Sequence, residues 1–320
     1  MQDKYGRKIT YLRISLTDKC NCHCRYCRPL KNDDSLIVNQ LSNEELALCI
    51  KAAVDIGINK IRLTGGEPLL RDDIIDIIRK IKNIDGVEEI CITTNGILLP
   101  KYAAELKKAG ANRINISIDS LNKDKYNYIT GGANLDNALK GLYAALETGF
   151  DKIKINTVLI GNFNEDEVVD FAKLTLDQPL DVRFIELMPM YDSGDFNENS
   201  FIPCSTVLDK LNEANIHFSE LPHNSGVARL YKIENSKGKI GLISPVSNHF
   251  CSECNRIRIT SDGKLKPCLH SSDEISIKNL DYENIKKKLC DTILSKPKEH
   301  DRLSYRERSK SGRNMNQIGG

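Results

Sequence analysis

Residues 20–27 read CNCHCRYC, a stretch in which Cys20, Cys24 and Cys27 form a CxxxCxxC triplet. Three soft thiolate ligands in one short loop suit an iron–sulfur cluster. Because three ligands cover only three irons of a 4Fe–4S cluster, the fourth iron can bind a substrate or a cofactor. Zinc is the alternative, with Cys22 as fourth ligand, but Cys22 and Cys24 are spaced too tightly to share one tetrahedral ion comfortably with the other two. We therefore interpret this loop as a cluster site.

Strand and helix patterns alternate along the first part of the chain. A β-rich run over 9–17 leads into the cysteine loop, and the helix that follows begins with Ser42 and Glu45 in capping-box spacing. Gly110 and Gly149 stand where helix C-caps belong. Further strands are expected over 60–64, 89–94, 113–118, 152–159 and 182–187, and helices from about 72 and near 101–109, 135–148 and 165–175. Six such units predict an α/β fold, a partial TIM-type barrel over residues 1–190 with parallel strands and right-handed crossovers.

Functional sites in such barrels lie at the carboxyl ends of the strands. Four short motifs follow predicted strands there, besides the cysteine loop: GGEP at 65–68, TTNG at 93–96, SIDS at 117–120 and ELMP at 186–189. Their common position predicts a single site at one end of the barrel.

The pattern changes after Pro189, where a polar linker begins. A helix near 206–213, strands over 229–234 and 239–243, and a helix over 282–294 predict a smaller α+β extension over residues 191–320. Within it, Cys251 and Cys254 form a CxxC motif and Cys268 follows, which predicts a second metal site. A 4Fe–4S cluster is one occupant. A Cys₃His zinc site is the other, because His249 and His270 flank the triplet.

Composition excludes several classes of protein. The 320 residues are 40% hydrophobic and 28% charged with a net charge of +2, so there is no global bias toward nucleic acid or membrane. The eleven cysteines gather in motifs and no apolar leader precedes Tyr11, which favours the reducing cytosol. No apolar run approaches the roughly 20 residues that cross a bilayer. The C-terminal tail is basic, but acidic residues among its cations favour a solvated segment over a nucleic-acid patch. These cations are Arg302, Arg306, Arg308, Lys310 and Arg313.

The cysteine loop after strand one, followed by GGEP after strand two, resembles the radical S-adenosylmethionine enzymes. The resemblance implies that S-adenosylmethionine binds the open iron of the first cluster and that the glycines let the backbone approach it closely. It also implies a set of cofactor-binding residues: Tyr26, Gly65, Glu67, Thr93, Ser117, Asn156 and Met188. The segment after the triplet, with Arg28, Leu30 and Lys31, departs from the Met-Pro-x-Glu run of that family.

The second triplet, the following Arg256 and Arg258, and the terminal Gly319-Gly320 resemble the GTP 3',8-cyclases of molybdenum cofactor biosynthesis, over nearly the whole chain. This resemblance implies two 4Fe–4S clusters and GTP as substrate. A 5'-deoxyadenosyl radical would abstract the ribose 3'-hydrogen, and the C3' radical would attack guanine C8. It further implies a homodimer and a cyclic pyranopterin monophosphate synthase as the next enzyme.

GTP is a polyanion, which fixed cations must meet. By the same resemblance, substrate-binding residues are Lys60, Arg62, Lys154 and Arg183, expected at or near strand carboxyl ends, together with Arg13, Arg256 and Arg258. The last three are associated with the tail, so that Arg13, Arg256, Arg258, Gly319 and Gly320 form the implied catalytic set. Without the resemblance, each cation could equally be a solvated charge at a strand end, and the glycines a frayed terminus.

Two other functions stay open on the residues alone. A peptide- or RNA-modifying radical enzyme with an auxiliary cluster would not need Arg256, Arg258 or the terminal glycines. A zinc- or cluster-stabilised binding protein would use the thiolates only for folding. The remaining cysteines carry no partner motif and are interpreted as buried or unassigned: Cys49, Cys91, Cys204 and Cys290.

Overall fold

The computed structural model of the 320-residue chain describes residues 1–28, 40–190, 196–222, 226–301, 303–304 and 307–319. Gly320, Arg302, Arg306, Leu30 and Lys31, and with them the predictions made for these positions, lie outside the described residues. Among the helices of the described ranges, none has the length and apolar character needed to cross a bilayer.

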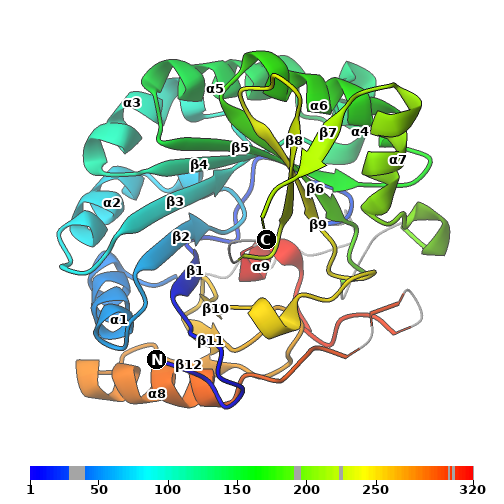
Figure 1. The fold of residues 1–320 in the computed structure, drawn as a ribbon. Helices are drawn as coiled ribbons and strands as arrows, with labels where there is room; N and C mark the ends of the chain where they lie inside the picture. Colours follow the sequence, from blue (N-terminus) through cyan, green and yellow to red (C-terminus); the bar gives the residue numbers. More distant parts are fainter. Residues whose placement is uncertain (29–39, 191–195, 223–225, 302, 305–306, 320) are drawn as a thin grey trace.

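The strands of the described chain form one continuous sheet (Figure 1). They are β1 (Tyr11–Ser15), β2 (Lys60–Thr64), β3 (Glu89–Thr94), β4 (Arg113–Ser117), β5 (Lys152–Leu159), β6 (Leu180–Glu186), β7 (Phe218–Glu220), β8 (Arg229–Ile233), β9 (Lys239–Ile243), β10 (Arg256–Ile259), β11 (Lys264–Lys266) and β12 (Ile275–Ser276). Their order is β12-β11-β10-β1-β2-β3-β4-β5-β6-β9-β8-β7. Strands β10, β1 to β6 and β9 run parallel, and the remaining strands extend each end antiparallel. Since β12 and β7 are the ends of this order, the predicted partial barrel is confirmed.

Helices cover the convex side of the curved sheet (Figure 1). They are α1 (Asn43–Asp55), α2 (Ile74–Lys82), α3 (Leu99–Ala109), α4 (Lys123–Thr130), α5 (Leu135–Thr148), α6 (Val168–Asp177), α7 (Ser205–Glu213), α8 (Tyr282–Leu294) and α9 (Met315–Ile318). Short 3-10 turns lie at Pro68–Leu70, Glu165–Glu167, Glu198–Ser200 and Cys251–Glu253. The short α9 is the exception to this arrangement, because it lies on the concave side.

The helix signals in the sequence are confirmed. Ser42 caps α1, with its hydroxyl accepting from Glu45 N at 3.2 Å and its backbone N–H donating to the Glu45 carboxylate at 2.9 Å. Gly110 and Gly149 end α3 and α5 in the left-handed conformation. Helix α4 was not predicted, because its sequence, KDKYNYIT, shows little apolar periodicity.

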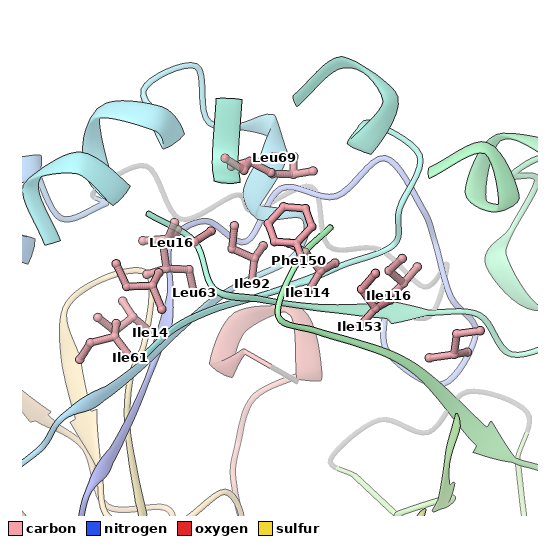
Figure 2. Packing of buried hydrophobic residues seen from close by; sticks show 14 of the residues in the cluster. Ile14, Leu16, Ile61, Leu63, Leu69, Ile92, Ile114, Ile116, Phe150 and Ile153 are labelled. Carbon is pink, nitrogen blue, oxygen red and sulfur yellow. The ribbon is translucent and has the colours of Figure 1, made fainter. Parts of the chain in front are cut away.

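Apolar and polar residues alternate along the parallel strands, which is unusual for a sheet covered by helices. Figure 2 shows Ile61, Leu63 and Ile114 pointing from the sheet toward the helices. The polar residues between them, such as Arg62 and Asn115, are also buried and therefore face the concave side. The concave side of the barrel is consequently lined by polar side chains instead of a packed apolar core, and we call this polar interior the chamber.

The predicted C-terminal extension does not form a separate layer. Its strands β7 to β9 continue the sheet beyond β6, and β10 to β12 continue it beyond β1. Helix α8 lies beside α1 (Figure 1). The domain boundary between residues 190 and 191 stays a prediction.

Candidate active site

The first cysteine loop follows β1 and is held by two neighbouring segments. The N–H of His23 donates to Thr130 O at 2.8 Å and that of Arg25 to Ile129 O at 3.0 Å, so the end of α4 fixes the loop from one side. On the other side, Gly66 N donates to Thr17 O at 2.6 Å. The ligand candidates Cys20, Cys24 and Cys27 are half-buried.

The two glycines of the GGEP segment are required by the close approach of a neighbouring backbone segment. A Cβ on Gly65 would lie 2.3 Å from Thr17 O, and one on Gly66 would lie 2.2 Å from Lys19 O. Both contacts are far too short for a side chain, so only glycine fits at these positions. The close approach in this structure is to the backbone that leads into the cysteine loop, whereas the sequence suggested an approach to a ligand.

Glu67 uses its carboxylate within the chain. It accepts from Leu69 N at 3.0 Å, from Asn95 N at 2.7 Å and from the Thr94 hydroxyl at 2.7 Å. Burial raises its pKa to about 7, against the lowering effect of these donors. Glu67 therefore joins the ends of β2 and β3, and its predicted contact with S-adenosylmethionine stays a prediction.

Tyr26 forms a hydrogen bond with a residue that the sequence did not connect to it. Its hydroxyl donates to Asp119 at 2.7 Å, and the other oxygen of Asp119 accepts from Val158 N at 2.8 Å. Burial raises the pKa of Asp119 to about 6. The ring packs near Phe196, with 6.4 Å between the ring centroids. Tyr26 thus ties the cysteine loop to the ends of β4 and β5.

The other predicted cofactor-binding residues are half-buried on neighbouring strands or just after them. Ser117 and Asn156 are register partners on β4 and β5, and Thr93 accepts from Arg62 at 3.4 Å. Met188 follows β6 by two residues. Their common edge agrees with the motif argument, while direct contact with a cofactor stays a prediction.

The predicted substrate cations lie nearer the amino ends of their strands than expected. Of the four expected at carboxyl ends, Lys60 opens β2 and Arg62 is its middle residue, while Lys154 is the third residue of β5 and Arg183 the fourth of β6. The expectation of carboxyl-end positions was wrong because these residues belong to the inward-facing alternation, which runs along the whole strand and not only at its carboxyl end. Register places Arg258, Arg13 and Arg62 side by side on β10, β1 and β2.

These cations repel one another in the buried interior. Burial lowers the pKa of Arg13 well below its usual range, and Arg258 and Arg62 lower it further. Burial likewise lowers the pKa of Arg258 to about 9 and that of Arg183 to about 10. Lys154 has a pKa of about 7, lowered first by burial and then by Arg183. A bound anion would reverse these shifts, since opposite charge favours the cationic forms.

Few acids oppose this positive charge within the described strands. Asp181 lies 3.0 Å from Lys154, and Glu89 lies 2.9 Å from Arg113. In the described part of the chain, the buried Nε of Arg183 has no hydrogen-bond partner. The chamber is therefore suited to a multiply charged anion.

The tail enters the concave side through α9 (Figure 1). The Arg258 guanidinium donates to Ile318 O at 3.1 Å and also to Gly319 O. The Asn316 side chain donates to Asp18 O at 3.1 Å, next to the first cysteine loop. Gly319 has φ +70°, and a Cβ there would lie 2.5 Å from Thr64 Cγ2. The tail of this same chain thus reaches both the arginines and the cysteine loop.

Only part of the predicted tail-associated trio contacts the tail directly. Arg258 does so through the two carbonyl groups, whereas Arg256 stacks its guanidinium over Phe250, 5.5 Å from the ring centroid. Arg13 lies next to Arg258 in register. The catalytic roles of the trio stay a prediction.

The second triplet lies near the amino end of β10. Cys254 lies two residues before this strand, and Cys251, Cys254 and Cys268 are all half-buried. Burial raises the pKa of Cys254, but Arg256 and Lys296 outweigh it and bring the pKa down to about 6. Lys296 was missed by sequence reasoning, because no local motif joins it to the cysteines.

The zinc alternative for the two cysteine triplets requires ligand atoms that lie close together. Zinc holds its sulfur ligands at about 2.3 Å, which brings tetrahedral ligand atoms within roughly 4 Å of one another. Across the described ranges, one group of three ligating side chains has all donor atoms within 4.8 Å, and it consists of His249, Cys251 and His300. Neither cysteine triplet is such a group, whereas His249, a histidine of the zinc alternative, does lie beside Cys251. The choice between a cluster and a Cys₃His zinc site at the second triplet stays a prediction.

The two triplets lie at opposite ends of neighbouring strands. The first follows the carboxyl end of β1, while Cys254 precedes the amino end of β10, and these strands pair in parallel. The four residues of β10 span about 13 Å. The row of Arg258, Arg13 and Arg62 lies between the two loops.

Two family models match the chain: the Radical SAM superfamily over residues 14–175 and Molybdenum Cofactor Synthesis C over residues 180–302. Among curated proteins, the chain is 47% identical to a GTP 3',8-cyclase of Alkaliphilus oremlandii over 100% of both chains. It is 46% identical to a GTP 3',8-cyclase of Peptoclostridium acidaminophilum, over 99% of this chain and 98% of the relative.

Solved structures share the fold at low identity. Streptococcus suis SuiB bound to S-adenosylmethionine matches with a TM-score of 0.66 and 15% identity, over 91% of this chain and 66% of that one. The protein anSMEcpe with bound AdoMet matches with a TM-score of 0.62 and 17% identity, over 93% of this chain and 81% of that one. These likenesses show the fold alone.

Proposed function

Because the chain belongs to the GTP 3',8-cyclase family of the radical S-adenosylmethionine superfamily, we propose that it converts GTP to 3',8-cyclo-7,8-dihydro-GTP in molybdenum cofactor biosynthesis. The observation that carries the proposal is the row of buried cations between two cysteine triplets. A polyanionic nucleotide bound there would neutralise mutually repelling arginines and face one triplet at each end.

Each cysteine triplet is proposed to hold a 4Fe–4S cluster. Cys20, Cys24 and Cys27 would hold the one that binds S-adenosylmethionine. Burial raises the pKa of the Cys27 thiol to about 12, so this thiol stays neutral until a metal displaces the proton. The second triplet would hold the cluster that faces the purine. Its support is the position of the three cysteines near the amino end of β10 and the pKa of Cys254, which Arg256 and Lys296 lower to about 6.

When bound, the first cluster and S-adenosylmethionine would supply the radical that removes the ribose 3'-hydrogen. C3' would then bond to guanine C8 as the C8–N7 double bond opens, and one electron from the second cluster and one proton would complete the product. The residues of the chain bind, orient and enclose the substrate. Lys154 and Arg183 would meet the phosphates, because both cations are buried and under-compensated by acids. Tail insertion would exclude water from the reacting atoms, which radical intermediates require.

The test is anaerobic turnover after reconstitution with iron and sulfide. We expect GTP to stimulate formation of 5'-deoxyadenosine and ATP not to do so. With GTP deuterated at C3', we expect deuterium in the 5'-deoxyadenosine. The variant Cys24→Ala should abolish both signals. Stimulation by a peptide instead of GTP, or deuterium-free 5'-deoxyadenosine, would refute the proposed reaction.

A homodimer, a cytosolic location and a cyclic pyranopterin monophosphate synthase as the next enzyme remain parts of the proposal. The homodimer and the synthase rest on the family alone, and the cytosolic location rests on the cysteine pattern of the sequence. Sedimentation of the loaded enzyme would test the dimer, and coupled turnover with such a synthase would test the product.

A further inference from the structure

Lys296 links the two segments that carry Cys254 and Cys268. Its ammonium donates to Arg256 O at 2.8 Å and to Pro267 O at 2.7 Å, and its Nζ lies 3.8 Å from Cys254 Sγ. Arg256 is two residues from Cys254, and Pro267 directly precedes Cys268. One side chain, which is 3% exposed, therefore fixes the relative position of two of the three cysteines.

The third cysteine is tied to the same short segment. Arg7 is buried and donates to Cys251 O at 2.8 Å, to Lys298 O at 2.9 Å and to Pro297 O at 2.6 Å. Residues 296–298 follow helix α8, so they connect to all three cysteine segments. Their position explains how cysteines from separate loops are held at one place.

The charge of Lys296 needs an anion nearby. A buried ammonium is costly unless it is paired. Among the described residues no carboxylate lies within ion-pair distance of Lys296, whereas the equally buried Lys266 has Glu274 at 3.1 Å. The Cys254 sulfur lies 3.8 Å from the ammonium and would carry negative charge as a thiolate ligand of a bound cluster.

We propose that Lys296 is a positioning residue of the second cluster, which holds the cysteine segments together and raises the reduction potential of that cluster. The inference rests on the proposed second cluster. A reduced cluster carries one more negative charge, and a cation beside a ligating sulfur stabilises it. The residue acts through the cluster and does not touch the substrate.

The experiment compares Lys296→Met, Lys296→Arg and a matched control, Lys298→Met, whose side chain is exposed on the same segment. All are made in the full chain with Cys20, Cys24 and Cys27 replaced by alanine, so that only the second cluster contributes. Iron and sulfide contents and an electron paramagnetic resonance redox titration are the readouts. Lys296→Gln is measured as well, in case Met prevents folding.

We expect Lys296→Met either to lose the second cluster or to shift its reduced-to-oxidised ratio at fixed potential by roughly tenfold or more toward the oxidised form. Lys296→Arg should retain most of the wild-type ratio, and Lys298→Met all of it. A folded Lys296→Met and Lys296→Gln with full iron and an unchanged titration would overturn the inference. If the parent chain itself binds no iron, the proposed second cluster fails and the inference falls with it.

Discussion

Replacing Gly319 by alanine should release the tail from the chamber. Gly319 adopts φ +70°, and a Cβ there would meet Thr64 Cγ2 at 2.5 Å. Two costs therefore add. The left-handed conformation costs an L-residue about 1–2 kcal/mol, and forcing a methyl group into a packed site costs about 1–3 kcal/mol.

Gly312 separates these two costs. It lies in the same tail with φ +66°, but nothing lies within 4 Å of its Cβ position. Gly312→Ala should therefore show the backbone cost alone, while Gly319→Ala should favour the released tail by roughly tenfold or more beyond it. Thr64→Ser removes the clashing methyl group and keeps the hydroxyl. The double variant Gly319→Ala/Thr64→Ser should therefore release the tail only as much as Gly312→Ala does.

Hydrogen exchange of tail peptides, followed by mass spectrometry, measures docking without any cluster or substrate. We expect faster exchange over residues 314–318 in Gly319→Ala than in Gly312→Ala, together with weaker GTP-dependent formation of 5'-deoxyadenosine. Equal exchange in the two variants would refute the packing argument. Fast exchange with full activity would instead separate tail docking from catalysis and sink the role assigned to the tail.

Three further results are expected. GTP affinity should fall as pH rises through about 7, because Lys154 has its pKa lowered to about 7 by burial and then loses its charge; calorimetry should show this slope disappear in Lys154→Met but not in Lys152→Met. Burial raises the pKa of Glu67 from 4.5 to about 7, so the folded state binds an extra proton in this window and stability falls as pH rises across it. The melting temperature of Glu67→Gln should not fall in this way as pH rises. An equal fall in the variant and the wild-type chain would contradict the role of Glu67. Zinc added to the metal-free chain should bind less tightly after His300→Ala but not after His217→Ala; equal losses would exclude the histidine site.

The sequence predicted the barrel well because its signals are local. Caps such as Ser42 with Glu45 and glycine stops such as Gly110 depend on residues within a few positions. Strand β10 was not recognised as a strand, although RIRI carries the same alternation as β1. Its parallel pairing with β1 joins residues about 245 positions apart, and no local signal reports such a pairing.

At the site, too, local motifs were predicted from the sequence and long-range contacts were not. The cysteine triplets and GGEP are short motifs, so their positions were predictable. The partners that hold them were not: Asp119 for Tyr26, and Lys296 for Cys254, come from distant segments. The predicted substrate cations lie at the start or in the middle of their strands and not at the carboxyl ends, because the motifs identified these residues while only the structure shows how far along each strand they lie.

The three arginines that are neighbours in the strand register differ in their contacts. Arg258 commits its guanidinium to Ile318 and Gly319, so it is engaged by the tail before any substrate arrives. Arg13 and Arg62 lie beside it in the same row. If the tail left, the Arg258 guanidinium would return to a chamber that already holds mutually repelling cations, and the repulsion would rise. Tail carbonyl groups therefore lower the electrostatic cost of gathering these cations, and an anionic substrate would lower it further. Tail docking and substrate binding should accordingly be coupled through Arg258, and hydrogen exchange of the tail measured with and without GTP reports that coupling directly.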